Sequence, residues 1–335
     1  WNWASKVLAS SVRRCALMTE KSALLQIGKV SDRMAEQLAA SFDVHRLMDE
    51  KDPECFLDDN GDRFVAVATM SGLPPEVMER LPNLKVVSSF GVGYDTIDAE
   101  ACAARGIIVS HTPDVLNDEV ADTALMLWLA VSRELVPSER WARSGVWEEK
   151  GAYPLSRSVR NRTVGIVGLG RIGQTIAEQA AMFNATVVYH SRSAKDVPYR
   201  YFADLTEMAR ASDVLIVITP GGPETKHLVN AEVIEALGRE GILINVARGS
   251  VVDEAAVADA LANGRLGGAG LDVFEQEPTI HEALKSLDNV VLLPHVGSAT
   301  VETRQAMGDL VCDNLDQWVK DGTVKTPVPE CKHLN

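Results

Sequence analysis

The segment "RTVGIVGLGRIGQTIAEQA", residues 162–180, constrains the fold more strongly than the rest of the chain. An apolar run comes first, glycines follow at positions 168, 170 and 173, and apolar residues then recur at helical spacing. This order predicts a buried strand, a tight glycine turn and an amphipathic helix. Such a unit normally belongs to a parallel sheet, because the helix returns the chain to the same edge.

Short apolar runs alternate with helical segments along most of the chain. In the first half, strands are expected at 23–28, 64–70, 84–91 and 107–110. In the second half, they are expected at 162–168, 186–190, 213–219, 241–246, 267–272 and 289–294. Helices are expected at 31–42, 74–81, 98–106, 117–135 and 302–320. The alternation predicts an α/β protein with two doubly wound parallel sheets.

Length, charge and cysteine content narrow the functional class. The 335 residues are enough for two domains. A net charge of −14 disfavours binding to nucleic acid or to an anionic membrane. The longest apolar run, residues 124–131, is too short to cross a bilayer. The five cysteines are scattered without CxxC spacing, which fits a reducing cytoplasmic setting and predicts neither disulfides nor a metal site.

Residues 1–17 differ in composition from the rest of the chain. They contain three basic residues and no acidic residue. Presequences have a similar composition, and Met18 offers a natural start after the segment. We therefore expect residues 1–17 to be an extension that is not part of the fold.

The glycine loop predicts a dinucleotide site, with the pyrophosphate at the N-terminus of the following helix. The expected contacts from the loop are Gly168, Leu169, Gly170, Arg171, Ile172 and Gly173. In NAD enzymes, an acidic residue after the next strand binds the ribose 2′-hydroxyl. Here Ser191, Arg192 and Ser193 occupy that region, and no acidic residue occurs from Thr186 until Asp196. A guanidinium beside two hydroxyls can bind a 2′-phosphate, so NADP(H) is predicted, with NAD as the weaker alternative.

Six motifs, the glycine loop among them, occur in a characteristic order: "SFGVGYDTID", "HTPDVLNDEVAD", "GLGRIGQ", "ARGSVVDE", "GLDVFEQEP" and "PHVGSAT". On these motifs the chain, from about residue 23 to 327, resembles the D-isomer-specific 2-hydroxyacid dehydrogenases. Within that family it is most similar to the glyoxylate/hydroxypyruvate and hydroxyphenylpyruvate reductases. The resemblance implies a Rossmann-like cofactor domain at 116–298, inserted into a flavodoxin-like substrate domain formed by 18–115 and 299–335. It also implies a homodimer.

The resemblance assigns catalytic roles to Arg248, Glu277 and His295. A histidine can donate a proton to the carbonyl oxygen of a 2-oxo acid near neutral pH. A carboxylate beside the imidazole favours its charged form and orients it, although Glu275 and Asp272 are rival partners. The planar guanidinium of arginine can bind the carboxylate and carbonyl of the substrate. All three residues follow predicted strands, at the edge where open α/β sheets bind ligands.

Other expected contacts are spread over several loops. The backbone of Val92 and Gly93 is expected to bind the substrate carboxylate, together with Arg248 and His295. Further pocket candidates are Met70, Ser71 and Gly72, with Trp141 or Trp147, the latter from a partner subunit. Further cofactor contacts are expected from Thr219, Pro220, Val246, Asp272, which would bind the nicotinamide carboxamide, and Gly297. Asn117 is expected to cap the long helix, and Trp128 is equally consistent with the core and with a subunit interface.

The predicted function is NADPH-dependent reduction of a small 2-oxo acid, glyoxylate or hydroxypyruvate, to the D-2-hydroxy acid. A reductase of hydroxyphenylpyruvate or of another 2-oxo acid is the alternative within the family. The missing acidic residue argues against NAD-linked phosphoglycerate and formate dehydrogenases, and no regulatory domain is seen after Pro327. A dinucleotide-sensing corepressor shares the fold, but it would need a peptide groove and usually long tails.

Overall fold

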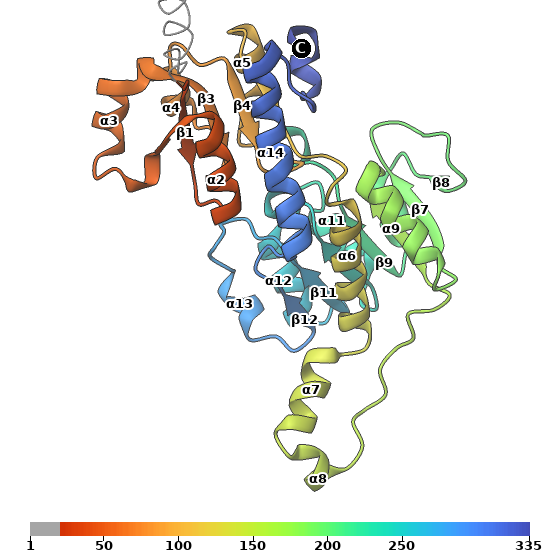
Figure 1. Ribbon diagram of the computed structural model, residues 1–335. Helices are drawn as coiled ribbons and strands as arrows, with labels where there is room; N and C mark the ends of the chain where they lie inside the picture. Colours follow the sequence, from red (N-terminus) through yellow and green to blue (C-terminus); the bar gives the residue numbers. More distant parts are fainter. Residues whose placement is uncertain (1–20) are drawn as a thin grey trace, which may run out of the picture. The chain divides into compact units, whose positions relative to one another are not determined.

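The computed structural model describes residues 21–335, which form two compact units (Figure 1). The first unit comprises the chain up to Thr112 together with Gly308–Asn335, and the second comprises Pro113–Met307. The extension expected at residues 1–17 lies outside the described residues. The assignment of substrate binding to 18–115 and 299–335, and of cofactor binding to 116–298, stays a prediction.

A five-stranded parallel sheet forms the centre of the first unit, in the order β2-β1-β3-β4-β5. Its strands are β1 (Ala23–Ile27), β2 (Asp43–Arg46), β3 (Phe64–Thr69), β4 (Val86–Ser89) and β5 (Ile108–Ser110). This strand order is that of flavodoxin-like folds. Strand β2 was not predicted, because it lies at the sheet edge and its sequence "DVHR" contains no apolar run.

The helices of the first unit are α2 (Asp32–Ser41), α3 (Pro53–Asn60), α4 (Pro75–Glu79), α5 (Ala99–Ala104) and the later part of α14 (Val301–Asp321). Helices α2 and α5 begin directly after the expected capping residues. Ser31 and Asp98 accept hydrogen bonds from N–H groups in the first turns of α2 and α5. Helix α14 packs beside α2, where a Cβ at Gly308 would lie 3.7 Å from Met34. The C-terminal helix therefore completes the core of a unit that begins near the N-terminus.

A seven-stranded parallel sheet forms the centre of the second unit, in the order β12-β11-β10-β9-β6-β7-β8. Its strands are β6 (Thr163–Val167), β7 (Thr186–His190), β8 (Arg200–Tyr201), β9 (Val214–Val217), β10 (Ile242–Asn245), β11 (Gly268–Leu271) and β12 (Val290–Leu292). The strand order reverses between β6 and β9, which is the position where doubly wound sheets bind dinucleotides. The two sheets confirm the predicted fold class.

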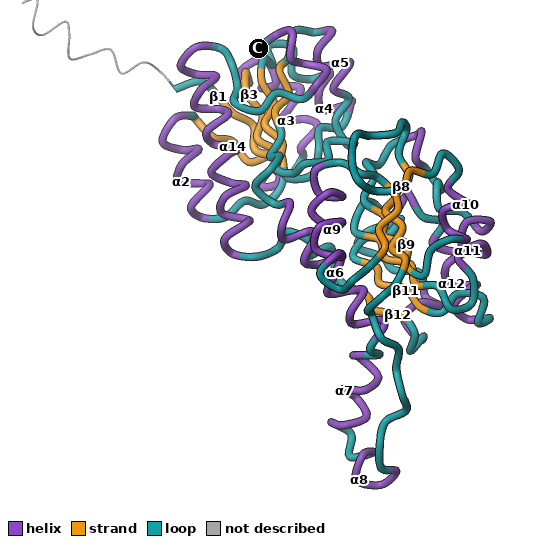
Figure 2. The backbone as a smooth tube through the Cα atoms, turned by 90° about the vertical axis from the view of Figure 1, so that its right-hand side faces the viewer, coloured by secondary structure: helices purple, strands orange, loops and turns teal. Residues whose placement is uncertain are grey.

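Helices cover both faces of the second sheet. The helices of the second unit are α6 (Asn117–Ser132), α7 (Leu135–Arg143), α8 (Val146–Lys150), α9 (Arg171–Ala181), α10 (Leu205–Arg210), α11 (Ala231–Leu237), α12 (Glu254–Ala262) and α13 (Glu282–Lys285). Figure 2 shows α6 and α9 on one side of the strands and α10, α11 and α12 on the other. Trp128 of α6 is fully buried and packs edge-on against Phe183, so it belongs to the core of this unit.

The start of α6 differs from the expectation. Asn117 is the first helical residue, and Leu116 occupies the capping position without a side-chain hydrogen bond. The predicted cap at Asn117 is therefore wrong, because a capping residue must have a non-helical backbone. The Asn117 amide instead donates to Asp114 at 3.4 Å. The helix also ends at Ser132, before the predicted residue 135.

Helices α7 and α8, with the extended segment 151–162, form an arm that reaches away from the seven-stranded sheet (Figure 1). Four large apolar side chains of this arm are exposed to solvent: Leu135, Val136, Trp147 and Leu155. None of the described helices is both long enough and apolar enough to cross a lipid bilayer.

Candidate active site

The glycine loop joins β6 to α9 at the carboxyl edge of the second sheet. Gly168 has a φ of +100°, and a Cβ there would lie 2.8 Å from the Thr219 backbone. A Cβ at Gly173 would lie 2.2 Å from the Gly168 carbonyl oxygen, whereas one at Gly170 would meet nothing within 4 Å. The first and third glycines are therefore required by the fold. The open space at Gly170, beside the N-terminus of α9, fits the pyrophosphate of a dinucleotide.

The other predicted contacts of the cofactor lie on the same edge of the sheet. Leu169 is buried in the core, so only its backbone can face a ligand. Arg171 and Ile172 lie in the first turn of α9, where the Arg171 guanidinium is 3.3 Å from Asp114. The remaining loop residues follow β9 and β10: Thr219, Pro220 and Val246.

Ser191, Arg192 and Ser193 form a short turn after β7. The Ser191 hydroxyl donates to the Ser193 carbonyl at 2.7 Å, and the Tyr201 hydroxyl donates to the Ser191 carbonyl at 3.2 Å. Arg192 and Ser193 are exposed. Because Ser191 uses its O–H within the turn, the side-chain donors that face solvent here are Arg192 and Ser193. A cation with a neighbouring hydroxyl fits a phosphate group.

His295 and Glu277 form a direct pair. The His295 Nδ1 atom lies 2.7 Å from Glu277 Oε2. The other carboxylate oxygen of Glu277 accepts the Phe274 N–H at 3.0 Å, which fixes the orientation of the carboxylate. The imidazole is 46 % exposed, and Nε2 makes no hydrogen bond to the described residues. This arrangement leaves one ring nitrogen available to a ligand.

The two rival acids bind elsewhere. Glu275 pairs with His227, which lies in the loop after β9. The carboxylate of Asp272 accepts two backbone N–H groups, those of Val296 and Gly297, and the hydrogen bond to the His295 ring comes from Glu277 instead. Among the three candidate acids, Glu277 is therefore the hydrogen-bond partner of the His295 side chain.

Asp272 holds the backbone of the loop that carries His295. Its carbonyl accepts the His295 N–H at 2.8 Å, while its carboxylate oxygens accept the N–H groups of Val296 and Gly297 at 2.7 and 2.8 Å. His295 has a φ of +54°, which is uncommon for a residue with a side chain. Burial raises the pKa of Asp272, and the two N–H donors oppose this effect. The sequence did not suggest this role in shaping the loop.

Arg248 lies in the loop after β10 and is half-buried. Asn245, the last residue of β10, donates to the Arg248 carbonyl and accepts the Ala247 N–H, each at 3.1 Å. A Cβ at Gly249 would lie 1.9 Å from the Phe274 backbone. The loop that carries Arg248 therefore packs directly against the loop that carries Glu277.

Glu254, at the start of α12, holds the loop around Glu277 from both sides. Its two carboxylate oxygens accept the N–H groups of Glu275 at 2.9 Å and of His281 at 2.8 Å. Glu254 is only 9 % exposed. Neither Glu254 nor Asn245 was singled out from the sequence. The available signal was a polar residue at the end of, or just after, an apolar run, in "ILINV" and "SVVDEAAV".

The residues predicted to bind the substrate through their backbone N–H groups lie in the first unit. Val92 and Gly93 follow β4, and the carbonyls of Gly91 and Val92 accept hydrogen bonds from the Thr112 N–H and from His111. The N–H groups of Val92 and Gly93 make no hydrogen bond to the described residues. Met70, Ser71 and Gly72 follow β3, where the Thr69 hydroxyl accepts the Ser71 N–H at 3.2 Å.

Residues 125–297 match the family model of the D-isomer specific 2-hydroxyacid dehydrogenase, NAD binding domain. Glyoxylate/hydroxypyruvate reductase A of Arabidopsis thaliana is 44 % identical over 92 % of this chain and 99 % of its own length. The chain belongs to the D-isomer-specific 2-hydroxyacid dehydrogenase family. Hydroxyphenylpyruvate reductase of Plectranthus scutellarioides is also 44 % identical, with the same coverage.

Solved structures of the family agree with this membership. An NADPH-dependent glyoxylate/hydroxypyruvate reductase from Sinorhizobium meliloti, in complex with NADP and malonate, is 48 % identical. The similarity covers 93 % of this chain and 98 % of that chain, with a TM-score of 0.89. This 2-hydroxyacid dehydrogenase is thus an oxidoreductase whose matched NAD-binding domain contains the glycine loop, Arg248, Glu277 and His295.

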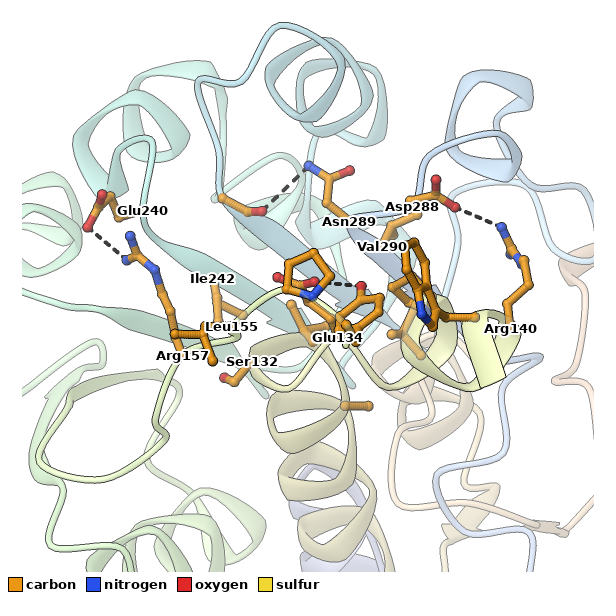
Figure 3. Close-up of a pocket in the computed structure, with 18 of the residues that line it drawn as sticks. Ser132, Glu134, Arg140, Leu155, Arg157, Glu240, Ile242, Asp288, Asn289 and Val290 are labelled. Carbon is orange, nitrogen blue, oxygen red and sulfur yellow. Dashed lines mark hydrogen bonds and ion pairs between the residues drawn. The ribbon is translucent and has the colours of Figure 1, made fainter. Parts of the chain in front are cut away.

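A cavity of about 790 Å³ lies at the opposite, amino edge of the seven-stranded sheet of the dehydrogenase (Figure 3). Ile242 and Val290 line it from the starts of β10 and β12, Glu134 from the residue before α7, and Leu155 from the extended segment of the arm. Trp141 also lines this cavity, while Trp147 is 62 % exposed on α8. Within the second unit, neither tryptophan is brought together with Arg248 and His295.

Proposed function

We propose that this dehydrogenase reduces a small 2-oxo acid, glyoxylate or hydroxypyruvate, to the D-2-hydroxy acid with NADPH. The main support is the His295–Glu277 pair, 2.7 Å apart, on the same sheet edge as a glycine loop with space for a pyrophosphate. Relatives named glyoxylate/hydroxypyruvate reductase, which match over more than nine-tenths of this chain, support the choice of substrate.

The protein side chains supply the proton and the charge stabilisation for this reaction. When bound, the reduced nicotinamide supplies a hydride to the carbonyl carbon. His295 then donates a proton from Nε2 to the carbonyl oxygen, while Glu277 at Nδ1 stabilises the imidazolium and holds the ring. Arg248 binds the carboxylate and the carbonyl through its planar guanidinium, and the N–H groups of Val92 and Gly93 are further proposed donors to the carboxylate.

The preference for NADPH is assigned to Arg192, with Ser193 as a smaller contributor. Both side chains are exposed after β7, and no acidic residue lies between Thr186 and Asp196 to repel a phosphate. The relative from Sinorhizobium meliloti, described as NADPH-dependent with NADP bound, supports this assignment. A hydrogen bond to a charged group contributes about 1.5–3 kcal/mol, which corresponds to roughly tenfold to hundredfold in affinity.

A panel of 2-oxo acids assayed with NADPH and with NADH tests the proposal. Glyoxylate and hydroxypyruvate should give the highest kcat/KM, and NADPH should be preferred. Arg192→Ala should lower kcat/KM for NADPH by roughly tenfold to hundredfold and leave NADH unchanged. Turnover of hydroxyphenylpyruvate in preference to the small acids would mean that the protein is a hydroxyphenylpyruvate reductase instead. A wild-type preference for NADH would refute the cofactor assignment.

We also infer that the protein is a homodimer that uses the arm formed by α7, α8 and residues 151–162. The arm exposes Leu135, Val136, Trp147 and Leu155, which is unusual for a surface that faces only water. The cavity between the base of the arm and the sheet offers a concave surface for an apolar segment of a second copy.

A further inference from the structure

Two consecutive carbonyl groups in the loop after β4 are held by the chain that follows β5. The Gly91 carbonyl accepts the Thr112 N–H at 2.8 Å. The Val92 carbonyl accepts a hydrogen bond from His111 Nδ1 at 2.9 Å. Because a carbonyl oxygen can only accept, Nδ1 of His111 must carry a proton in this contact.

Because peptide groups are planar and trans, these two contacts also fix the direction of two N–H groups. In a trans peptide, the C=O and the next N–H point in opposite directions. Holding the Gly91 carbonyl toward Thr112 therefore turns the Val92 N–H away from that strand end. Holding the Val92 carbonyl toward His111 does the same for the Gly93 N–H. Neither N–H makes a hydrogen bond to the described residues.

We propose that His111 is a positioning residue that aims the Gly93 N–H at the substrate carboxylate. This inference rests on the proposed function, which places that carboxylate against Val92 and Gly93. Thr112 performs the same task for the Val92 N–H with its backbone. Of these two contacts, only the one from His111 is made by a side chain. It can therefore be removed by mutation.

Neighbouring side chains hold the imidazole of His111 in place. Tyr94 packs edge-on against it, with ring centroids 5.5 Å apart, and the Tyr94 hydroxyl donates to Glu330 at 3.1 Å. The His111 backbone exchanges hydrogen bonds with Thr326, whose hydroxyl donates to the His111 carbonyl. The C-terminal segment therefore supports the ring that holds the Val92 carbonyl.

The test compares three substitutions of His111. Asn places an amide N–H near the position of Nδ1, Gln extends its amide toward the position of Nε2, and Leu donates no hydrogen bond. His111→Leu and His111→Gln should raise KM for glyoxylate by roughly tenfold, the effect of one hydrogen bond to a charged ligand site. His111→Asn should restore KM to within about threefold of wild type. The dissociation constant of NADPH should not change.

Binding of oxamate, an unreactive analogue of a 2-oxo acid, separates this inference from the proposed function. Calorimetry with NADPH-saturated enzyme should give the same order of affinity: wild type, Asn, then Gln and Leu. His45→Leu, on edge strand β2, is the control and should bind oxamate like wild type. Lack of turnover with any 2-oxo acid would overturn the proposed function. Equal oxamate affinity in wild type, Leu, Gln and Asn, or an equal loss in all three variants, would overturn the role of His111.

Discussion

At the scale of single residues, the pairing of His295 with Glu277 leads to two different kinetic effects. His295→Ala removes the proton donor and should lower kcat by roughly 10²–10⁴-fold. Glu277→Gln keeps a hydrogen bond to Nδ1 but removes the negative charge beside the imidazolium, so kcat should fall by a smaller factor than in His295→Ala. Steady-state kinetics of the two variants check this. An unchanged kcat in Glu277→Gln would show that Glu277 serves only as a structural contact.

Two glycines of the same motif should respond differently to substitution by alanine. A Cβ at Gly173 would lie 2.2 Å from the Gly168 carbonyl, so Gly173→Ala should destabilise the second unit strongly. A Cβ at Gly170 would meet nothing within 4 Å, so Gly170→Ala should fold normally and bind the dinucleotide more weakly. Thermal unfolding and titration with NADPH distinguish the two. Normal NADPH binding by Gly170→Ala would mean that the pyrophosphate lies elsewhere.

At the scale of elements, Glu254 couples the start of α12 to the loop around Glu277. Glu254→Gln retains only one good acceptor for the N–H groups of Glu275 and His281, so a buried donor loses its partner. Unfolding free energy should fall by about 1–3 kcal/mol, and kcat should fall because Glu277 is less well oriented. Glu232→Gln, an exposed acidic residue in the first turn of α11, is the matched control. If both variants behave like wild type, the loop is held by other contacts.

At the scale of the whole molecule, the proposed homodimer should depend on the arm. A variant with Trp147→Ser and Leu155→Ser should sediment as a monomer, while wild type sediments as a dimer, because both apolar side chains are exposed in the single chain. Met182→Ser removes another exposed apolar side chain, outside the arm, and should remain dimeric. A monomeric wild type would contradict the proposal, and an unchanged dimer in the double variant would move the interface away from the arm.

Several features could be predicted from the sequence because they depend on local patterns. Buried parallel strands appear as short apolar runs, and this signal predicted β1, β3, β4 and the core strands of the second sheet. The glycine loop was predictable because turn, ligand approach and helix packing each require glycine within six residues. Edge strands β2 and β8 were missed, because a strand exposed at its edge needs no apolar run.

Other features were decided only by the tertiary structure. Three acidic residues compete for His295 within six positions of the sequence, and the side-by-side order of β9, β10 and β11 determines their partners. Glu275 meets His227 from the β9 loop, Asp272 binds the backbone after β12, and Glu277 remains for the imidazole. Buried hydrogen bonds of this kind join residues distant in sequence, so their partners depend on the packing of strands and loops rather than on local periodicity.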